Sequence, residues 1–249
     1  ARPGREARRR RHGKMNVSRE PPKPRQLPLD LGHLPGLSRD DLVVSSANLQ
    51  AVGMIDRWPD WPAPVVLLAG PAGSGKSHLA AIWREHSGAI QLDASDIVAH
   101  VGEIGASPVL IDDADQGRLD QEGLFHLINA IRGAHSHLLI TARSFPSAWG
   151  VSLPDLASRL KAAATVEIEE PDDLLLAGVI TKLFADRQVD VEPHVVQFLV
   201  RRIERSLSTA IRVVEKLDRA ALEHKSRITR ALAAEMIGAL DAGQGELDV

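Results

Sequence analysis

The sequence predicts an α/β fold, in which a five-stranded parallel sheet is sandwiched by helices and a helical domain follows. Three observations predict it. Between residues 40 and 170, short apolar runs alternate with stretches of helical periodicity, which is typical of parallel strands joined by helical crossovers. From residue 171 to residue 240, only helical patterns follow. The 249 residues, of which 44% are hydrophobic, are enough to bury such a core.

Strands are expected where short apolar runs lie between turn signals, because a strand of a parallel sheet is buried on both faces. These runs are Val65–Ala69, Ala89–Leu92, Val109–Ile111, Leu138–Thr141 and Thr165–Ile168. Helical spacing predicts the core helices Ser77–His86, Leu153–Lys161 and one that begins after Asp120. An aspartate is a favoured N-cap residue, so Asp120 marks the start of that helix.

Each helix expected in the C-terminal domain has its own start signal. Asp172, Ser206 and Thr229 are residue types that cap helix N-termini, and Pro193 suits the first turn of a helix. The predicted organisation is therefore a flexible tail (residues 1–39), an α/β core (40–170), a helical domain (171–240) and a short tail (241–249).

The composition excludes several classes of protein. There is no cysteine, which rules out disulfides, zinc thiolates and thiol catalysis and fits a reducing compartment. No apolar run approaches the roughly 18 residues of a membrane helix. The basic residues 1–14 precede the first methionine, Met15; they lack the apolar segment of a secretion signal and are expected to be a flexible extension rather than a DNA-binding arm. We expect a cytoplasmic protein without membrane contact.

A glycine-rich loop between the first strand and the next helix matches the P-loop pattern G-x-x-x-x-G-K-[ST]. Its residues are Gly70, Pro71, Ala72, Gly73, Ser74, Gly75, Lys76 and Ser77, and His78 follows as a further candidate contact. The loop N–H groups and the helix N-terminus attract phosphate. Lys76 is expected to contact the β- and γ-phosphates, and the Ser77 hydroxyl to ligate Mg²⁺. The loop therefore predicts an adenine-nucleotide site.

The strand Val109–Ile111 ends in two aspartates that complete this site. Asp112 is expected to hold the magnesium ion through water, and Asp113 to orient or polarise an attacking water. The alternative is that both residues only begin a turn. Thr141 and Arg143 end the next strand, near the position where a γ-phosphate sensor would lie.

With these motifs in place, the chain resembles AAA+ proteins, and among them the DnaA family with its short Hda branch. The segment Leu153–Leu160 (LPDLASRL) is similar to the arginine-finger helix of that family, and Val213–Ala220 (VVEKLDRA) resembles part of the Hda lid. The resemblance covers about residues 40–240 and includes no helix-turn-helix domain. It implies an AAA+ core with a helical lid, and no direct sequence-specific DNA binding.

The resemblance also implies roles for single residues. Arg159 would reach the γ-phosphate of ATP bound to a neighbouring subunit, and Val44 would lie beside the adenine. The family's sensor arginine in the lid aligns with Ser208, and whether Arg205 or Arg212 replaces it is left open. This departure implies very slow intrinsic ATP turnover.

A short peptide in the N-terminal tail resembles the sliding-clamp-binding peptide of Hda. It offers Gln26, Leu27, Leu29 and Leu31, a glutamine amide and three leucines in an extended segment that can enter an apolar pocket. The alternative is that these leucines dock on the protein's own core.

Together these features imply a clamp-tethered regulator that binds adenine nucleotide and stimulates hydrolysis of DnaA-bound ATP, which limits re-initiation of chromosome replication. The expected partners are the DNA polymerase sliding clamp and DnaA, and the expected cofactors are ADP or ATP with Mg²⁺. The alternatives are an independently active ATPase such as a helicase loader, a P-loop small-molecule kinase, or an adaptor that uses nucleotide only for stability. The sequence leaves open the working nucleotide and whether the chain forms a homo-oligomer.

Overall fold

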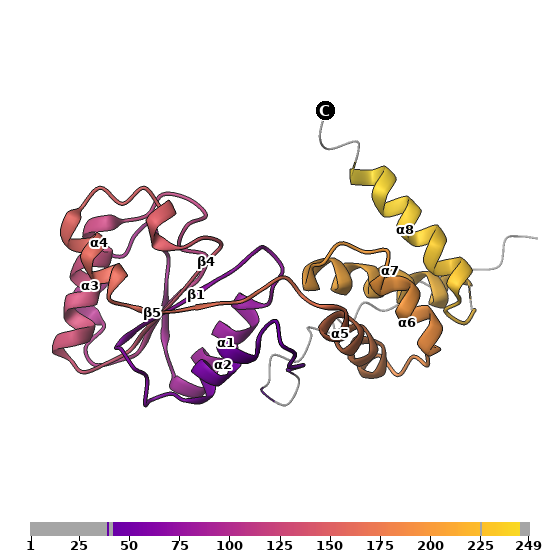
Figure 1. Ribbon diagram of the computed structural model, residues 1–249, viewed down its shortest axis with the longest axis horizontal. Helices are drawn as coiled ribbons and strands as arrows, with labels where there is room; N and C mark the ends of the chain where they lie inside the picture. Colours follow the sequence, from indigo (N-terminus) through magenta and orange to yellow (C-terminus); the bar gives the residue numbers. More distant parts are fainter. Residues whose placement is uncertain (1–38, 40–41, 225, 245–249) are drawn as a thin grey trace, which may run out of the picture. The chain divides into compact units, whose positions relative to one another are not determined.

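The structure is a computed structural model that describes residue 39, residues 42–224 and residues 226–244 (Figure 1). Its strands are β1 (Val65–Ala69), β2 (Ile90–Leu92), β3 (Val109–Ile111), β4 (Leu138–Ala142) and β5 (Ala164–Glu167). The helices of the core are α1 (Leu49–Asp56), α2 (Lys76–Ser87), α3 (Gln121–Gly133) and α4 (Pro154–Lys161), with short 3-10 turns at Val101–Glu103 and Pro146–Ala148. The remaining helices are α5 (Asp173–Asp186), α6 (Pro193–Val200), α7 (Leu207–His224) and α8 (Arg230–Gln244).

The five strands form one parallel sheet in the order β2-β3-β4-β1-β5. This confirms the predicted fold class. Strand β1 lies between β4 and β5, with Leu67 opposite Ile140 on one side and Thr165 on the other. All five residues of β1 are buried, as expected for a central strand covered on both faces.

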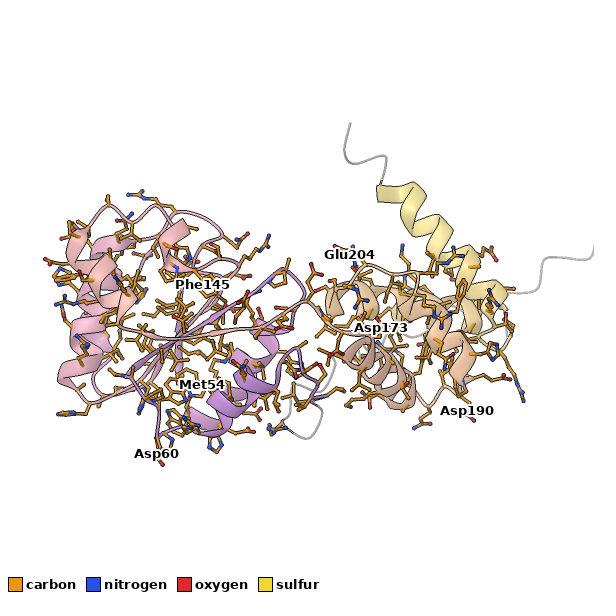
Figure 2. The ribbon with its side chains drawn as sticks, in the orientation of Figure 1. Met54, Asp60, Phe145, Asp173, Asp190 and Glu204 are labelled. Carbon is orange, nitrogen blue, oxygen red and sulfur yellow. The ribbon has the colours of Figure 1, made fainter. Side chains whose placement is uncertain are left out.

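Alternate residues of β1 belong to two separate apolar layers. Val65, Leu67 and Ala69 join a cluster with residues of α3 and α4. Val66 and Leu68 join a second cluster with residues of α1 and α2. The side chains in Figure 2 fill the space between the sheet and these helices. The core is therefore a three-layer sandwich, since successive side chains of a strand point to opposite faces.

The lid, residues 171–244, is built from α5, α6, α7 and α8 around an apolar cluster of its own. The start signals lie where the sequence predicts them. The Asp172 carboxylate accepts a hydrogen bond from the Leu175 N–H at 2.7 Å and caps α5, and Pro193 is the first residue of α6. Helix α8 continues to Gln244, four residues beyond the predicted end of the helical domain.

Candidate functional site

The glycine-rich loop connects β1 to α2 and needs its glycines. Gly73 and Gly75 have φ angles of +71° and +100°, a left-handed region that residues with a side chain rarely adopt. At Gly70, a Cβ atom would overlap the carbonyl oxygen of Ile168, so the loop and the end of β5 approach closely. This geometry directs the loop backbone toward the start of α2, where N–H groups lack intrahelical partners.

Lys76, the first residue of α2, is only 4% exposed. Its Nζ donates hydrogen bonds of 2.8 Å to the carbonyl oxygens of both Gly70 and Pro71. Burial lowers the pKa of Lys76; the charge of Arg143 lowers it further, while the nearby aspartates, Asp113 foremost, raise it. Two cations therefore lie near each other at the loop, and binding of an anion would relieve their repulsion.

The two predicted aspartates are joined to Thr141 on the neighbouring strand. The Thr141 hydroxyl donates to the Asp112 carboxylate and accepts a 2.8 Å hydrogen bond from the Asp113 N–H. The Ser77 hydroxyl donates to the same carboxylate at 3.2 Å. Ser77 and Asp112 thus place two oxygen ligands side by side, which fits Mg²⁺ because that ion takes few protein ligands and completes its shell with water and phosphate. Among the described residues, no group of three or more acidic, histidine or cysteine side chains could hold a metal ion by itself.

Asp115 fixes the chain segment that follows β4, and the sequence did not single it out. Its carboxylate accepts hydrogen bonds from the N–H groups of Arg143 and Ser144 and from the Ser144 hydroxyl, at 2.7–3.1 Å. Burial alone would raise the pKa of Asp115, but these donors outweigh it and hold the pKa below its ordinary value. The consequence is a fixed backbone at Arg143, whose side chain lines the cavity described next.

A cavity of about 360 Å³ lies over the loop, within the usual size range of ligand sites. Its polar part comprises the loop from Ala72 to Ser77 together with Asp113 and Arg143. Its apolar part contains Leu42 and Val43 before α1, and lid residues of α5 and α7: Leu175, Val179, Leu183 and Ile211. His78 and Ser208 also line it. A phosphate-binding end and an apolar end in one cavity match the two chemical halves of a nucleotide.

Val44 does not line this cavity, and its side chain is 37% exposed, whereas Val43 does line it. Asn48 holds this segment in place: its amide donates to the Val43 carbonyl oxygen and its carbonyl oxygen accepts from the Ser45 N–H, both at 2.9 Å. Successive residues of an extended segment point in opposite directions, so Val43 lines the cavity and Val44 does not.

Neither of the two arginines considered as replacements at Ser208 lines the cavity. Arg205 donates to the carboxylate of Asp173 at 2.8 Å (Asp173 is labelled in Figure 2) and to the Pro171 carbonyl oxygen at 3.2 Å. Arg212 donates to the Thr209 hydroxyl at 3.1 Å. The cationic side chains that line the cavity are instead Lys76, Arg143 and Lys182, of which Lys182 also pairs with Asp186.

Arg159 lies outside this cavity, on α4. Its Nε donates to the Asn129 side-chain oxygen at 2.9 Å, and its guanidinium lies over the Phe125 ring, 4.5 Å from the centroid. The predicted peptide with Gln26, Leu27, Leu29 and Leu31 lies outside the described residues. In the described part of the chain, no helix is long and apolar enough to cross a membrane.

Comparisons with known proteins find similarity to DnaA and to the lid domain of Hda. A family model described as the lid domain of Hda matches residues 179–237. The DnaA of Sphingopyxis alaskensis is 28% identical over 248 aligned residues, which cover 87% of this chain and 54% of that protein. An uncharacterised protein of Haemophilus influenzae is 25% identical, over 82% of this chain and 95% of its own length. The chain is similar to DnaA, and its lid is similar to that of Hda. It spans about half the length of the Sphingopyxis DnaA.

Solved structures show the same fold at lower identity. Domain III of the DnaA from Thermotoga maritima has a TM-score of 0.68 and 17% identity, over 83% of this chain and 97% of that one. A DnaA bound to AMPPCP and single-stranded DNA has a TM-score of 0.65 and 16% identity, over 74% of this chain and 65% of that one. The fold is therefore that of these DnaA structures, as the sequence predicts, and the lid matches the Hda lid model over residues 179–237.

Proposed function

We propose that this protein is a regulator of replication initiation that binds an adenine nucleotide in its own cavity and stimulates the hydrolysis of ATP bound to DnaA. The observation that carries the second part is the position of Arg159. Its guanidinium belongs to a helix outside the cavity and forms no ion pair with the described residues, so its charge is available to a second protein.

The protein's own nucleotide site is supported by the chemistry of the cavity. Lys76, Arg143 and the loop N–H groups present positive charge, and Ser77 with Asp112 presents oxygen ligands for Mg²⁺. When bound, the nucleotide supplies the phosphate charge that these groups neutralise. The apolar residues Val43, Val179 and Ile211 would contact its base. Because no lid arginine lines the cavity among the described residues, we propose that the nucleotide stabilises the active conformation and is hydrolysed very slowly.

The action on a partner follows from the chemistry of arginine. In a phosphoryl transfer, an arginine from a second subunit stabilises the charge that develops on the γ-phosphate and accelerates the reaction by about 10³-fold or more. We propose that Arg159 fills this role toward ATP held by DnaA. The proposed tether is the peptide with Gln26, Leu27, Leu29 and Leu31, which would dock on the sliding clamp and raise the local concentration near DNA-bound partners.

The test is a single-turnover assay. Labelled ATP is pre-bound to DnaA, clamp-loaded DNA is added, and hydrolysis is followed with and without this protein. We expect stimulation by the wild type and none by Arg159→Ala. The matched control is Arg202→Ala, which removes a lid arginine whose guanidinium lies 5.5 Å from the Phe198 ring centroid and should keep full stimulation.

Two further variants separate the alternatives. Replacing Gln26 and Leu29 together by alanine should abolish stimulation on clamp-loaded DNA and leave nucleotide binding intact. Lys76→Ala should abolish both nucleotide binding and stimulation. Full stimulation by Arg159→Ala would contradict the proposal, and rapid ATP turnover by the isolated protein would indicate an independent ATPase instead.

A further inference from the structure

Two arginines of the lid lie over the same aromatic ring. The guanidinium carbon of Arg230, the first residue of α8, is 4.9 Å from the centroid of the Phe198 ring on α6, and that of Arg202, which follows α6, is 5.5 Å from it. Helices α6 and α8 pack against each other (Figure 1), which brings these two segments of the chain together at the ring. The lid therefore holds two positive charges close together at its surface.

Neither charge is neutralised within the described part of the chain. Both side chains are exposed, and apart from their contact with the Phe198 ring they form no ion pair or hydrogen bond there. Arg201 and Arg227, which lie near Arg202 and Arg230 in the sequence, are also exposed and unpaired among the described residues. An aromatic ring attracts a cation but does not cancel its charge, so these guanidiniums keep their N–H donors for an external anion.

This stretch of the lid is basic although the chain as a whole is not. Residues 201–230 contain nine basic and four acidic side chains, whereas the whole chain has a formal net charge of -3. Three of the four carboxylates are engaged elsewhere: Glu215 and Asp218 each lie 3.8 Å from the guanidinium of Arg187, and Glu204 accepts a 3.0 Å hydrogen bond from a threonine hydroxyl. The acidic side chains of the stretch therefore leave most of its positive charge uncompensated.

A phosphate group is the anion that suits this surface. The N–H groups of a guanidinium match two oxygens of a phosphate in geometry, and several exposed guanidiniums can each bind one phosphate along a nucleic-acid backbone. Proteins that bind single strands also stack unpaired bases on free aromatic rings. The Phe198 ring carries two guanidiniums and is not free for stacking, which favours the backbone of a duplex.

We infer that Arg202 and Arg230, together with Arg201 and Arg227, bind the phosphate backbone of double-stranded DNA. The choice of DNA rests on the clamp tether given under Proposed function, which places the protein on DNA. Contacts to phosphate carry no base information, so this binding is independent of sequence and agrees with the expected lack of sequence-specific DNA binding. It gives the lid a second attachment to the DNA that the clamp encircles.

The test measures binding of the isolated full-length protein to a labelled DNA duplex by fluorescence anisotropy over a range of salt concentrations. The double variant Arg202→Gln, Arg230→Gln removes both charges and keeps part of both aliphatic stems over the ring. The logarithm of its association constant should fall less steeply with the logarithm of the salt concentration, by about two in slope, one for each lost phosphate contact. Its affinity at about 100 mM salt should be lower by at least tenfold.

Two double variants serve as controls. Arg57→Gln, Arg132→Gln removes the same charge from two exposed arginines of the core that form no ion pair with the described residues, and it should keep the wild-type slope. Arg202→Lys, Arg230→Lys keeps both charges of the lid pair and should keep the slope as well. The basic residues 1–14 are present in every variant, so their contribution to binding is the same throughout. Circular dichroism checks that each variant is folded.

A wild-type slope in Arg202→Gln, Arg230→Gln would overturn the inference, and so would an equal loss in Arg57→Gln, Arg132→Gln. If the lid variant bound DNA normally but lost binding to poly-glutamate, the surface would serve an acidic protein instead. These measurements use neither DnaA nor the clamp, so the inference and the action of a trans arginine can fail independently. Arg202→Ala alone removes one contact while the tether keeps the protein at the DNA, so full stimulation by that single variant stays the expected result.

Discussion

The backbone N–H of Leu207 donates a 2.8 Å hydrogen bond to the carbonyl oxygen of Gly73. Leu207 is the first residue of lid helix α7, and Gly73 lies in the glycine-rich loop, so this bond ties the lid to the loop. Ser206 lies so close to the Gly73 Cα that a Cβ atom there would overlap its side chain. The lid and the loop are therefore in contact through a backbone hydrogen bond and through the Ser206 side chain. We expect the lid to respond when a nucleotide binds to the loop.

Replacement of Gly73 tests this contact. Gly73→Ala introduces both a strained φ of +71° and an overlap with Ser206. The control Gly105→Ala has a similar φ of +58° and nothing within 4 Å of the added Cβ. The control should lower the free energy of unfolding by about 1–2 kcal/mol through backbone strain alone, and Gly73→Ala by about 1–3 kcal/mol more through overpacking. Urea unfolding measures both, and equal losses would contradict a tight contact.

The Thr141 hydroxyl gives a second prediction. Thr141 is fully buried, accepts the Asp113 N–H and donates to Asp112. Thr141→Val keeps the shape but leaves the Asp113 N–H without this acceptor, which should cost about 1–3 kcal/mol of stability. Thr141→Ser keeps the hydroxyl and loses only a methyl group, so it should cost about 1 kcal/mol. Thermal unfolding of both variants checks that Thr141→Val is the less stable of the two. If Thr141→Val were as stable as Thr141→Ser, the hydrogen bond to the Asp113 N–H would be unimportant for stability.

The lowered pKa of Asp115 predicts that the stability of the fold depends on pH. Because the donors at Arg143 and Ser144 hold its pKa below the ordinary value of 3.8, the folded state binds the proton of this carboxyl less readily than the unfolded chain. The resulting stability is present above the unfolded pKa and is lost as the pH falls through the lower, folded pKa. Asp115→Asn should therefore lose about 1–2 kcal/mol near neutral pH and progressively less toward pH 3.

The comparison for this variant is Asp93→Asn. The Asp93 carboxylate accepts hydrogen bonds from Ser95 but is fully exposed. Asp93→Asn should therefore change the free energy of unfolding less than Asp115→Asn does. Denaturant titrations at neutral and acidic pH measure the difference. A cost for Asp115→Asn that stays constant with pH would contradict the assignment of the stabilisation to the ionised carboxylate.

Local pattern was sufficient for most of the fold. The run Val109–Ile111 is a strand with the predicted bounds, because three apolar residues before two aspartates leave little choice. Helix α1, Leu49–Asp56, was not predicted. It contains Gly53, has no side-chain cap at Asn48, and its first residue Leu49 is 59% exposed, so it lacks the signals that define a helix in isolation. Its stability comes from residues such as Ala51 and Val52, which pack on the second apolar layer.

Those parts of the site that lie within one continuous segment were predictable from the sequence. The contacts between neighbouring strands were not. The loop through Lys76 and the aspartates after β3 are each visible as a motif. The bond between Thr141 and Asp112 depends on β3 and β4 being neighbours in the sheet, and the anchoring of Arg143 by Asp115 depends on the same pairing. Neither strand order nor side-chain partners 28 residues apart can be derived from periodicity.

Arg143 provides the last prediction, on ligand binding. It lines the cavity with Lys76, whereas Arg205 and Arg212 bond elsewhere in the lid. Arg143→Ala should weaken binding of a fluorescent ADP analogue by about tenfold to a hundredfold, since a charge-assisted contact to phosphate contributes about 1.5–3 kcal/mol. Arg212→Ala is the control and should bind as the wild type does. Weaker binding in Arg212→Ala with unchanged binding in Arg143→Ala would show that the lid supplies the phosphate-binding arginine after all, through a rearrangement of α7 that the nucleotide itself induces.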